Sequence, residues 1–393
     1  MMEKTILILL GIYSLVLFIR HILTYIYYRK EVKNIDELEI CNKLSLKDLT
    51  IFQPILSGDR YLQEKLTYIY NNSQDTEVIW AIDEDDHEAE RIVNEIIGKN
   101  PKENLIIMKC KKSSFHENPK VYKIIQRRNL WRKYTVILDD DTSIDIESLK
   151  NISVETLDKS VITGIPYYLK AGNLWENLLK SYVNSNSIYN YLTAAFFKKN
   201  NTINGMFYIF KSEKIKSLDL YNQIKGKLCD DYEFAKIVRK NNISIQQSIF
   251  PCKLNTEIKD FKTFIKIMRR WHIFVNHYLK DNINIEIIVF SLIPFVSGSL
   301  FLLFSIIYNH NYIYLLLIIF TFNSLLGKII RRKIFGEYEN ILDMILEIFS
   351  NIVQIFYWFL SLIQPDRITW RGKLVKIKNG TIEVNIDEQK NKG

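Results

Sequence analysis

The sequence predicts an α/β domain with a parallel β-sheet, held between membrane-spanning helices. Two observations lead to this prediction. The apolar residues are unevenly spread along the 393 residues, and strand-like and helix-like runs alternate between residues 40 and 280. Thirteen Gly and seven Pro are about half of average usage or less, which excludes collagen-like and linker-rich proteins. The four Cys include no CxxC pair, so neither a disulfide scaffold nor a zinc ribbon is expected.

The first apolar block runs from Thr5 to Tyr28 and is long enough to cross a bilayer core. Its only strongly polar members are Arg20 and His21. A signal peptide would have a shorter apolar core and a small-residue cleavage site, so we expect a signal-anchor helix. Arg29 and the lysines that follow it predict that the next part of the chain lies in the cytoplasm.

Apolar blocks return near the end of the chain. Ile285 to Tyr308 and Tyr312 to Ile330 are predicted to be two further spans. Residues 341–363 are apolar but contain Asp343 and Glu347, and here an interfacial or re-entrant helix is favoured over a fourth span. The basic tail should stay in the cytoplasm, which three spans allow and four do not.

The region between these blocks alternates strands with helices. Buried-strand runs are expected at residues 49–52, 77–82, 104–108 and 134–138, with helices at 61–70, 88–97 and 120–130. This order predicts a parallel sheet with helices on both faces, in which ligands bind beyond the carboxyl ends of the strands. The net charge of +9 is then explained by membrane contact and a diphosphate, so no nucleic-acid partner is expected.

Three acidic clusters follow apolar runs. Residues 83–86 (DEDD) open a helix, where acids are also favourable without any function. Residues 139–141 (DDD) would repel one another unless a cation lies among them, and oxygen-only ligands suit Mg²⁺ or Mn²⁺ beside a diphosphate. In the pair Asp230 and Asp231, one carboxylate could act as a general base with its pKa tuned by the other.

A basic stretch at residues 262–277 contains Arg269, Arg270 and Trp271. Such a helix could simply lie on anionic lipid. Alternatively, the guanidinium and indole groups could close over a leaving diphosphate.

Taken together, these motifs resemble the ceramide glucosyltransferase family of membrane-bound, family-2-type glycosyltransferases. The resemblance covers most of the chain and rests on QPILSGD, WAIDEDD, ENPKVYKI, VILDDDT, GIPYY, NGMFYIF, CDDYEFAKIVRKN and the segment QPDRITWRGKLVKIKNG. It implies a GT-A fold, an α/β architecture with a mixed, mainly parallel sheet and transmembrane α-helices at both ends.

The resemblance also implies roles for individual residues. It makes Asp231, Asp230, Arg270 and Trp271 catalytic candidates, with Asp231 as the base. Donor binding is carried over to Asp83, Asp85, Asp86, Lys120, Asp139 and Arg270, metal binding to Asp139 and Asp141, and acceptor binding to Gly205 and Met206. The family's (Q/R)xxRW motif is matched at Arg270 and Trp271, but Ile267 stands where Gln or Arg is usual; Lys266 or Arg269 could substitute.

The implied activity is an inverting hexosyl transfer, most simply from UDP-glucose to the hydroxyl of a membrane lipid such as ceramide, with Mn²⁺ or Mg²⁺ as cofactor. Other acceptors stay open: diacylglycerol, a polyprenyl phosphate or a growing polysaccharide. A catalytically inactive membrane scaffold also stays open. The replacement of the usual Gln or Arg by Ile267 favours it, whereas the intact acidic clusters oppose it.

The expected organisation is a multi-pass protein of the cell membrane or a Golgi-type internal membrane, with its catalytic domain facing the cytoplasm. Its predicted segments are an anchor at 1–30, the GT-A domain at 31–260, an amphipathic interfacial helix at 261–282, membrane or interfacial helices at 283–366 and a basic cytoplasmic tail at 367–393.

Overall fold

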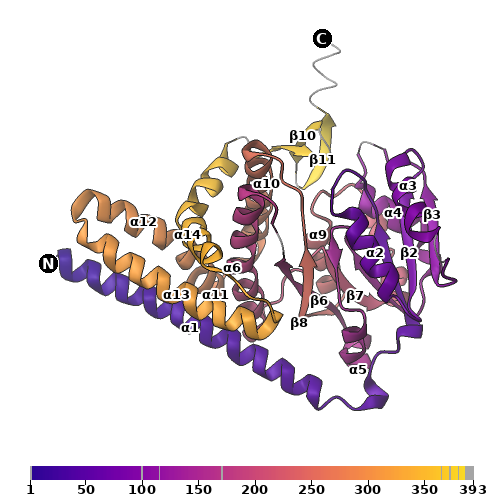
Figure 1. Cartoon of the computed structure of the whole chain (residues 1–393), viewed down its shortest axis with the longest axis horizontal. Helices are drawn as coiled ribbons and strands as arrows, with labels where there is room; N and C mark the ends of the chain where they lie inside the picture. The colour runs from indigo at the N-terminus through magenta and orange to yellow at the C-terminus, as the bar shows by residue number, and fades with distance from the viewer. Residues whose placement is uncertain are drawn as a thin grey trace, which may run out of the picture. The chain divides into compact units, whose positions relative to one another are not determined.

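The computed structural model describes residues 2–98, 101–114, 116–169, 171–363, 365–370, 373–378 and 380–385 (Figure 1). The chain divides into two compact units. The helical unit contains the residues up to Val32 together with Pro166–Asn200 and Ile258–Pro365. The sheet unit contains Lys33–Ile165, Asn201–Glu257 and the described residues from Asp366 onward.

The sheet unit is built on eight strands in the order β3-β2-β1-β4-β7-β6-β8-β5. Strands β3, β2, β1 and β4 are parallel, whereas β7 pairs antiparallel with β4 and β6, and β5 pairs antiparallel with β8. The predicted mixed α/β sheet is therefore confirmed. The strands are β1 (Leu49–Pro54), β2 (Glu77–Asp83), β3 (Leu105–Cys110), β4 (Tyr134–Leu138), β5 (Thr142–Ser143), β6 (Ser160–Tyr168), β7 (Phe207–Lys211) and β8 (Ser244–Leu254).

Helices cover both faces of this sheet because its inner strands are buried on both sides. In β2, Val78, Trp80 and Ile82 pack into one core cluster, whereas Ile79 and Ala81 pack into the other. The first cluster takes in side chains of α2 (Leu62–Asn72), α3 (His87–Ile97) and α5 (Val154–Lys159). The second takes in side chains of α4 (Pro119–Arg127), α7 (Ser212–Ser217), α8 (Leu220–Ile224) and α9 (Asp230–Lys240).

The strand order reverses between β1 and β4. From β1 the sheet extends to β2 and β3 on one side, and to β4 on the other. In open α/β sheets the crevice at such a switch point, outside the carboxyl ends of the strands, is where ligands bind. The backbone amide of Leu56, just after β1, donates to Asp140 Oδ2, just after β4, at 2.6 Å. The two strand ends are thus joined at this edge.

The described end of the chain also belongs to the sheet unit. It forms a three-stranded antiparallel sheet of β9 (Arg367–Trp370), β10 (Lys373–Lys378) and β11 (Thr381–Asn385). Thr381 bridges to Lys227, and the Leu228 amide donates to Gly380 O at 3.0 Å. The tail therefore packs beside the segment that leads into α9.

The helical unit is built from long helices. They are α1 (Met2–Asp36), α6 (Leu174–Phe196), α10 (Phe261–Asn282), α11 (Ile285–Ile287), a π-helical turn (Ile288–Leu292), α12 (Ile293–Tyr308), α13 (Asn311–Phe335) and α14 (Ile341–Leu362). Buried side chains of α1 and α13, such as Leu10 and Phe320, share one apolar cluster, and Figure 1 draws these helices side by side. Among the described residues, four helical segments are long and apolar enough to cross a membrane: Glu3–Asp36, Ile285–Tyr308, Asn311–Phe335 and Ile341–Leu362.

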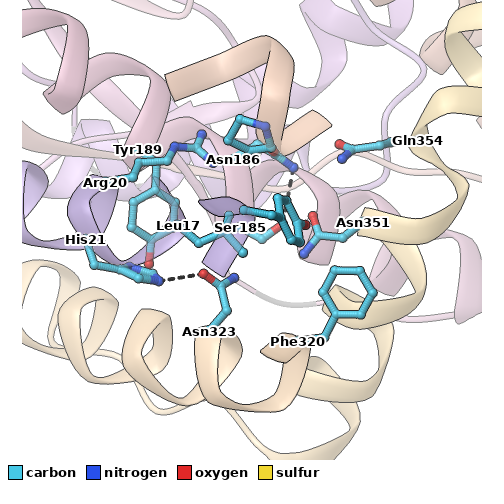
Figure 2. Close-up of a pocket in the computed structure, with 12 residues that line it drawn as sticks. Leu17, Arg20, His21, Ser185, Asn186, Tyr189, Phe320, Asn323, Asn351 and Gln354 are labelled. Atoms are coloured by element: carbon cyan, nitrogen blue, oxygen red, sulfur yellow. Dashed lines mark hydrogen bonds between the residues drawn. The ribbon is translucent and has the colours of Figure 1, made fainter. Parts of the chain in front are cut away.

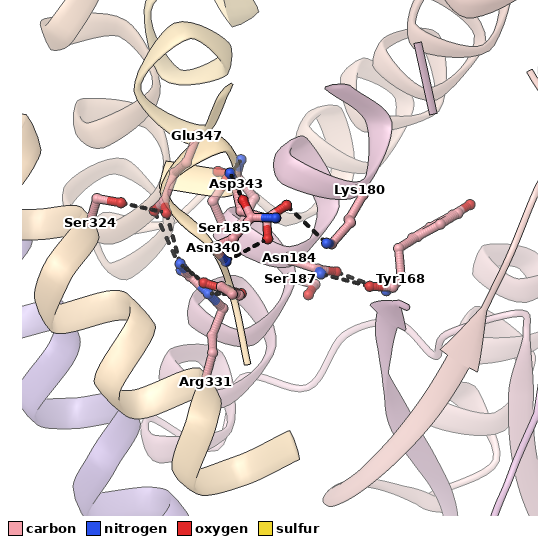
Figure 3. Close-up of polar contacts among 12 residues, drawn as sticks. Tyr168, Lys180, Asn184, Ser185, Ser187, Ser324, Arg331, Asn340, Asp343 and Glu347 are labelled. Carbon is pink, nitrogen blue, oxygen red and sulfur yellow. Dashed lines mark hydrogen bonds and ion pairs between the residues drawn. The ribbon is translucent and has the colours of Figure 1, made fainter. Parts of the chain in front are cut away.

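Helix α14 is one continuous helix of 22 residues. Whether it spans the membrane or lies at the interface stays a prediction. Its polar side chains turn inward: Asp343 pairs with Lys180 at 2.9 Å, and Glu347 accepts from Ser324 at 2.8 Å (Figure 3). The apolar Phe356 is exposed. The acids that counted against a span are thus paired within the unit.

Candidate functional site

A half-buried lysine lies among several of the predicted site residues in the sheet unit. Lys120 Nζ lies 2.7 Å from Asp139 Oδ1 and 3.6 Å from Asp230 Oδ2, and donates to Gly205 O at 2.7 Å. These residues come from the start of α4, the end of β4, the start of α9 and the loop before β7. We call Lys120, Asp139, Asp230, Asp231 and Gly205 the Lys120 cluster.

The local sequence explains where Lys120 lies. Asn118 caps α4, accepting from the amides of Lys120 at 3.0 Å and Val121 at 3.4 Å, and Pro119 occupies the first turn, where its missing N–H costs nothing. The side-chain amide nitrogen of Asn118, Nδ2, donates to Asp230 Oδ1 at 3.4 Å. One residue thus fixes the helix start and orients one carboxylate toward the lysine.

Charge pairing dominates the titration of this cluster. Burial alone would lower the pKa of Lys120, but the charges of Asp139 and Asp230 outweigh it and raise that pKa well above its usual value. Burial raises the pKa of Asp139, and the attraction of Lys120 offsets only part of this. The lysine is consequently a permanent positive charge between two carboxylates.

Asp231 is the next residue of α9 and has different partners. Its Oδ1 accepts from the Cys229 thiol at 3.0 Å and from the Tyr232 amide at 2.7 Å. Burial, and then the neighbouring charge of Asp230, raise the pKa of Asp231. Burial likewise holds the pKa of Cys229 well above the usual range, so its thiol is a neutral donor rather than a nucleophile. This arrangement orients one carboxylate oxygen and keeps the group basic.

The three consecutive aspartates after β4 point to different partners. Asp140 accepts from the Leu56 amide, and Asp141 accepts from the hydroxyls of Thr142 at 2.9 Å and Thr256 at 3.2 Å. Burial, followed by the charge of Asp141, raises the pKa of Asp140 to about 8. Burial, followed by the charge of Asp139, raises the pKa of Asp141 to about 6. These carboxylates hold more negative charge than their surroundings neutralise.

This donor set fits a hard divalent cation. Carboxylate and hydroxyl oxygens are the ligands that Mg²⁺ and Mn²⁺ prefer, and Mg²⁺ is usually held by one or two carboxylates plus substrate phosphates. In the part of the chain that the structure describes, no three carboxylate, histidine or cysteine side chains converge closely enough to hold a metal by themselves. The ammonium of Lys120 lies 2.7 Å from Asp139.

The first acidic cluster has structural partners. Asp83 pairs with the buried Lys123 at 3.0 Å, and the exposed Asp85 pairs with Lys112. Asp86 caps α3, accepting from the Ala89 amide and from the Ser57 amide, each at 3.0 Å. Burial would raise the pKa of Asp86, but these hydrogen bonds outweigh it and hold the pKa below its usual value. Asp86 thereby ties the loop after β1 to the start of α3.

Arg270 and Trp271 lie on α10 and belong to the helical unit. Burial lowers the pKa of Arg270, and its Nε has no hydrogen-bond partner among the described residues. Arg269 donates to the carbonyls of Leu360 at 3.2 Å and Ile363 at 2.7 Å, at the end of α14. It is thus engaged with that helix end, while Lys266 is exposed. The catalytic roles of Arg270 and Trp271, and donor binding by Arg270, stay predictions.

A family model described as glycosyl transferase family 21 matches residues 15–383. The chain belongs to glycosyl transferase family 21. Family 21 is the ceramide glucosyltransferase family, so the family resemblance inferred from the motifs is confirmed at this level. A comparison with curated protein sequences found no match.

Solved structures of glycosyltransferases are similar to this chain at low identity. One is the mannosyltransferase PcManGT from Pyrobaculum calidifontis in complex with GDP-Man and Mn²⁺, with 13% identity, 90% of this chain and 98% of that chain covered, and a TM-score of 0.46. Another is S. aureus TarS 1-349 in complex with UDP-GlcNAc, with 14% identity, 86% and 99% covered, and a TM-score of 0.36.

Two buried lysines at this edge of the sheet were not foreseen. Lys123 donates to Ile55 O at 2.5 Å as well as pairing with Asp83, and Lys65 donates to Ser143 Oγ and Lys253 O, each at 3.2 Å. Burial lowers the pKa of Lys65 to about 8, against the attraction of Asp141. The signal was present in the sequence: Lys65 lies on the apolar face of α2, between Leu62 and Ile69.

Gly205 is predicted to lie on the acceptor side of the site, and a substitution can test this prediction. A Cβ at this position would lie 3.1 Å from Asp231 Oδ2 and 3.2 Å from Asp231 Cβ, so Gly205→Ala should displace the carboxylate. We expect a kcat lower by about 10²-fold, because sub-ångström to ångström misplacement of a reacting group costs that much. Steady-state kinetics and Tm of the purified protein measure this. Gly11→Ala, where a Cβ meets nothing within 4 Å, is the matched control; an unchanged kcat in Gly205→Ala would remove Gly205 from the site.

Proposed function

We propose that this family 21 glycosyltransferase moves a hexose, glucose from UDP-glucose, onto the hydroxyl of a membrane lipid such as ceramide, with inversion. The observation that carries the proposal is the position of Asp231. It is a half-buried carboxylate with a raised pKa, oriented by Cys229 and beside Gly205. Membership of family 21 and four helices of membrane-spanning length support a lipid acceptor.

The chemistry follows from a single in-line displacement. Asp231 accepts the proton of the lipid hydroxyl while that oxygen attacks the anomeric carbon. The bond between that carbon and the diphosphate oxygen breaks, and UDP leaves with the electron pair. Arg270 is proposed to neutralise the departing diphosphate. Inversion needs no covalent intermediate, and a raised pKa makes Asp231 a stronger base than an exposed aspartate.

Asp139 and Asp141 would hold the divalent cation, Mn²⁺ or Mg²⁺, which supplies charge neutralisation at the diphosphate. Lys120, at 2.7 Å from Asp139, keeps this carboxylate oriented. Asp83, Asp85 and Asp86 are proposed to lie near the nucleotide, with Asp86 acting through the loop that contains Ser57. Gly205 and Met206 line the acceptor side; the Met206 carbonyl accepts from the Asp139 amide at 3.0 Å.

The packing of the tail within the sheet unit limits how many helices between them can cross the membrane. Because β9–β11 pack within the sheet unit, residues on both sides of the segment Ile258–Pro365 must lie on the same face of the membrane. An even number of helices in that segment can then cross. Of the three candidate spans in that segment, we propose that α12 and α13 cross and that α14 lies at the interface, which keeps the number of crossings even and places the sheet unit and tail in the cytoplasm. Protease digestion of sealed vesicles should remove a tag on the tail and the loops of the sheet unit together.

The substrates are tested by incubating the purified full-length protein with a panel of nucleotide sugars and lipids. We expect transfer from UDP-glucose to ceramide, read out by mass analysis of the extracted lipid. A product on diacylglycerol or polyprenyl phosphate alone would replace ceramide as the acceptor. Release of free UDP without a glycolipid, or no turnover with any pair, would contradict lipid glycosylation.

The divalent cation can be tested without turnover. Mn²⁺ would relieve repulsion among the half-buried aspartates after β4, so it should raise the Tm of the purified protein, and EDTA should reverse the rise. In Asp141→Asn the rise should be lost, because the amide carries no charge. Asp145→Asn, an exposed aspartate near the same strand, is the control and should keep the rise. An equal Mn²⁺ response in both variants would place the cation elsewhere.

A further inference from the structure

The polar cavity among the helices of the helical unit is too small to be a substrate site. It is lined by Arg20, His21, Tyr189 and Asn323, among other residues, and its volume is about 20 Å³ (Figure 2). This space is enough for about one water molecule, and neither a sugar nor a lipid fits there. The sheet unit, in contrast, has a contact that bears directly on the proposed base.

The C-terminal sheet β9–β11 contacts residues 225–229, which lead into α9 and which we call the α9 entry loop. Thr381, the first residue of β11, forms an antiparallel bridge with Lys227, and Lys227 Nζ donates to Thr381 Oγ1 at 3.0 Å. The backbone amide of Leu228 donates to Gly380 O at 3.0 Å. Lys227 and Thr381 are 154 residues apart in sequence, so the end of the chain returns to this loop.

The α9 entry loop is also held by Asn118, the residue that caps α4. The Asn118 amide donates to Lys225 O at 2.6 Å, and its side-chain Nδ2 donates to Lys227 O at 3.1 Å. The same Nδ2 donates to Asp230 Oδ1 at 3.4 Å. The loop is thus joined to both α4 and β11, immediately before the first carboxylate of α9.

The tail supplies the hydrogen-bond acceptor for the backbone of Leu228. This residue is buried, and its amide donates to Gly380 O. A buried amide that loses its acceptor costs free energy comparable to a lost hydrogen bond. Without the tail in place, the loop would have to rearrange at Leu228 to find another acceptor.

Only a short stretch of backbone connects this contact to the proposed base. Cys229 follows Leu228, and its thiol donates to Asp231 Oδ1 at 3.0 Å. There is little free space around either end of this stretch: a Cβ at Gly226 would lie 3.3 Å from His116 O, and a Cβ at Gly205 would lie 3.1 Å from Asp231 Oδ2. A rearrangement of the loop would therefore displace the carboxylate of Asp231.

We propose that the C-terminal sheet positions the catalytic carboxylate, with Lys227 and Thr381 as positioning residues that act through the α9 entry loop. The inference rests on the proposed function, in which Asp231 is the general base. The hydrogen bond between Lys227 and Thr381 fixes the loop, so that Asp231 meets the acceptor hydroxyl within the distance that proton transfer needs. The last strands of the chain are then part of the sugar-transfer machinery.

Lys227→Met and Thr381→Val each remove this hydrogen bond from the full-length protein. Both replacements nearly keep the size of the side chain, and valine suits a strand. We expect kcat for glycolipid formation to fall by about 10-fold. This is less than the ~10²-fold cost of an ångström-scale misplacement, because the bond from the Leu228 amide to Gly380 remains. The Kd for UDP-glucose should stay unchanged, since Asp231 is proposed to act on the acceptor.

Three further variants make this test specific. Thr381→Ser keeps the hydroxyl and should keep the native kcat, and so should Lys376→Met, which removes an exposed lysine of β10. The double variant of Lys227→Met and Thr381→Val should have the kcat of either single variant, because both break the same contact. A double variant in which the two losses multiply would overturn the proposed contact.

The same substitution in an Asp231→Asn protein shows whether the tail acts through the base. There, Thr381→Val should cause no further fall in the residual turnover, because the group that it positions is already absent. A further 10-fold fall would overturn the proposal. A lower Tm with native kcat in both tail variants would also overturn it, because the tail would then serve stability alone. So would a weaker Kd for UDP-glucose in both tail variants, which would assign the tail to the donor.

Failure of the proposed function would give a different result. Asp231→Asn would then keep the native turnover by itself, whatever the tail variants do. An inactive Asp231→Asn beside native kcat in Lys227→Met and Thr381→Val would instead overturn only the role of the tail.

Discussion

Replacing Asp231 with asparagine should lower the rate of sugar transfer by about 10²- to 10⁴-fold, the usual contribution of a general base. The substitution keeps the size of the side chain, and the amide oxygen can still accept from Cys229 and Tyr232. The nucleotide sugar should bind with unchanged affinity, because Asp231 is proposed to act on the acceptor proton. Steady-state kinetics gives the rate, and calorimetric titration with UDP-glucose gives the binding.

The pairing of these two measurements makes the prediction specific. A misfolded variant would lose both turnover and donor binding, whereas loss of the base spares the donor. Asp145→Asn, at an exposed position, controls for a general effect of removing an acid. Turnover within a few-fold of the native rate in Asp231→Asn would show that another group takes the proton.

The pH dependence of kcat/KM also tests the assignment of Asp231 as the general base. Burial and the charge of Asp230 raise the pKa of Asp231, so its basic form is lost on acidification at a higher pH than an ordinary aspartate. We expect kcat/KM to fall along an acidic limb at that raised pKa. Asp230→Asn removes the second of the two causes, so the limb should move to lower pH even where the absolute rate falls. A limb that does not move would separate Asp230 from the titrating group.

The parallel half of the sheet could be predicted because it is encoded locally. The run expected at residues 77–82 is β2 (Glu77–Asp83), and the run expected at 134–138 is β4 (Tyr134–Leu138). Both are short, almost wholly apolar and end in acids, which is typical of inner parallel strands. The antiparallel pairing of β7 with β4 and β6 was not predictable in this way, because the strand runs expected from the sequence end at β4.

The candidate site, like the sheet, could be predicted from the sequence only in part. Acidic clusters after apolar strands are visible in the sequence, and they indicated the edge of the sheet where Asp139 and Asp230 lie. The identity of their counter-ion was not visible, since Lys120 and Asp230 are 110 residues apart and meet only in the folded sheet unit. A resemblance to a family motif marked Lys120 for the donor, whereas the structure also shows it neutralising two carboxylates. The sequence shows where the charged residues occur, whereas the fold determines which residues they pair with.

Replacing Lys120 with methionine should lower the free energy of unfolding by about 3 kcal/mol, the lower end of the cost of breaking a buried ion pair, because 19% of the Lys120 side chain and 29% of the Asp139 side chain stay exposed. Methionine fills a similar volume, so the loss comes from leaving Asp139 and Asp230 without their positive charge. Chemical denaturation of the purified protein measures it. Lys112→Met is the matched control: its partner Asp85 is exposed, and surface ion pairs contribute little, so no measurable loss is expected.

The sign of the pH dependence separates this electrostatic cause from a packing defect. Burial already raises the pKa of Asp139 in the folded protein, and removal of Lys120 should raise it further. A carboxylate whose pKa is raised in the folded state destabilises the fold least at a pH where it is protonated. The free energy of unfolding lost in Lys120→Met should therefore be smallest in acid and should grow as the pH rises through that pKa. Adding Asp139→Asn to Lys120→Met should restore part of the lost stability, because the charge that lacked a partner is then absent. A deficit that is constant with pH and unaffected by Asp139→Asn would assign the role of Lys120 to packing alone.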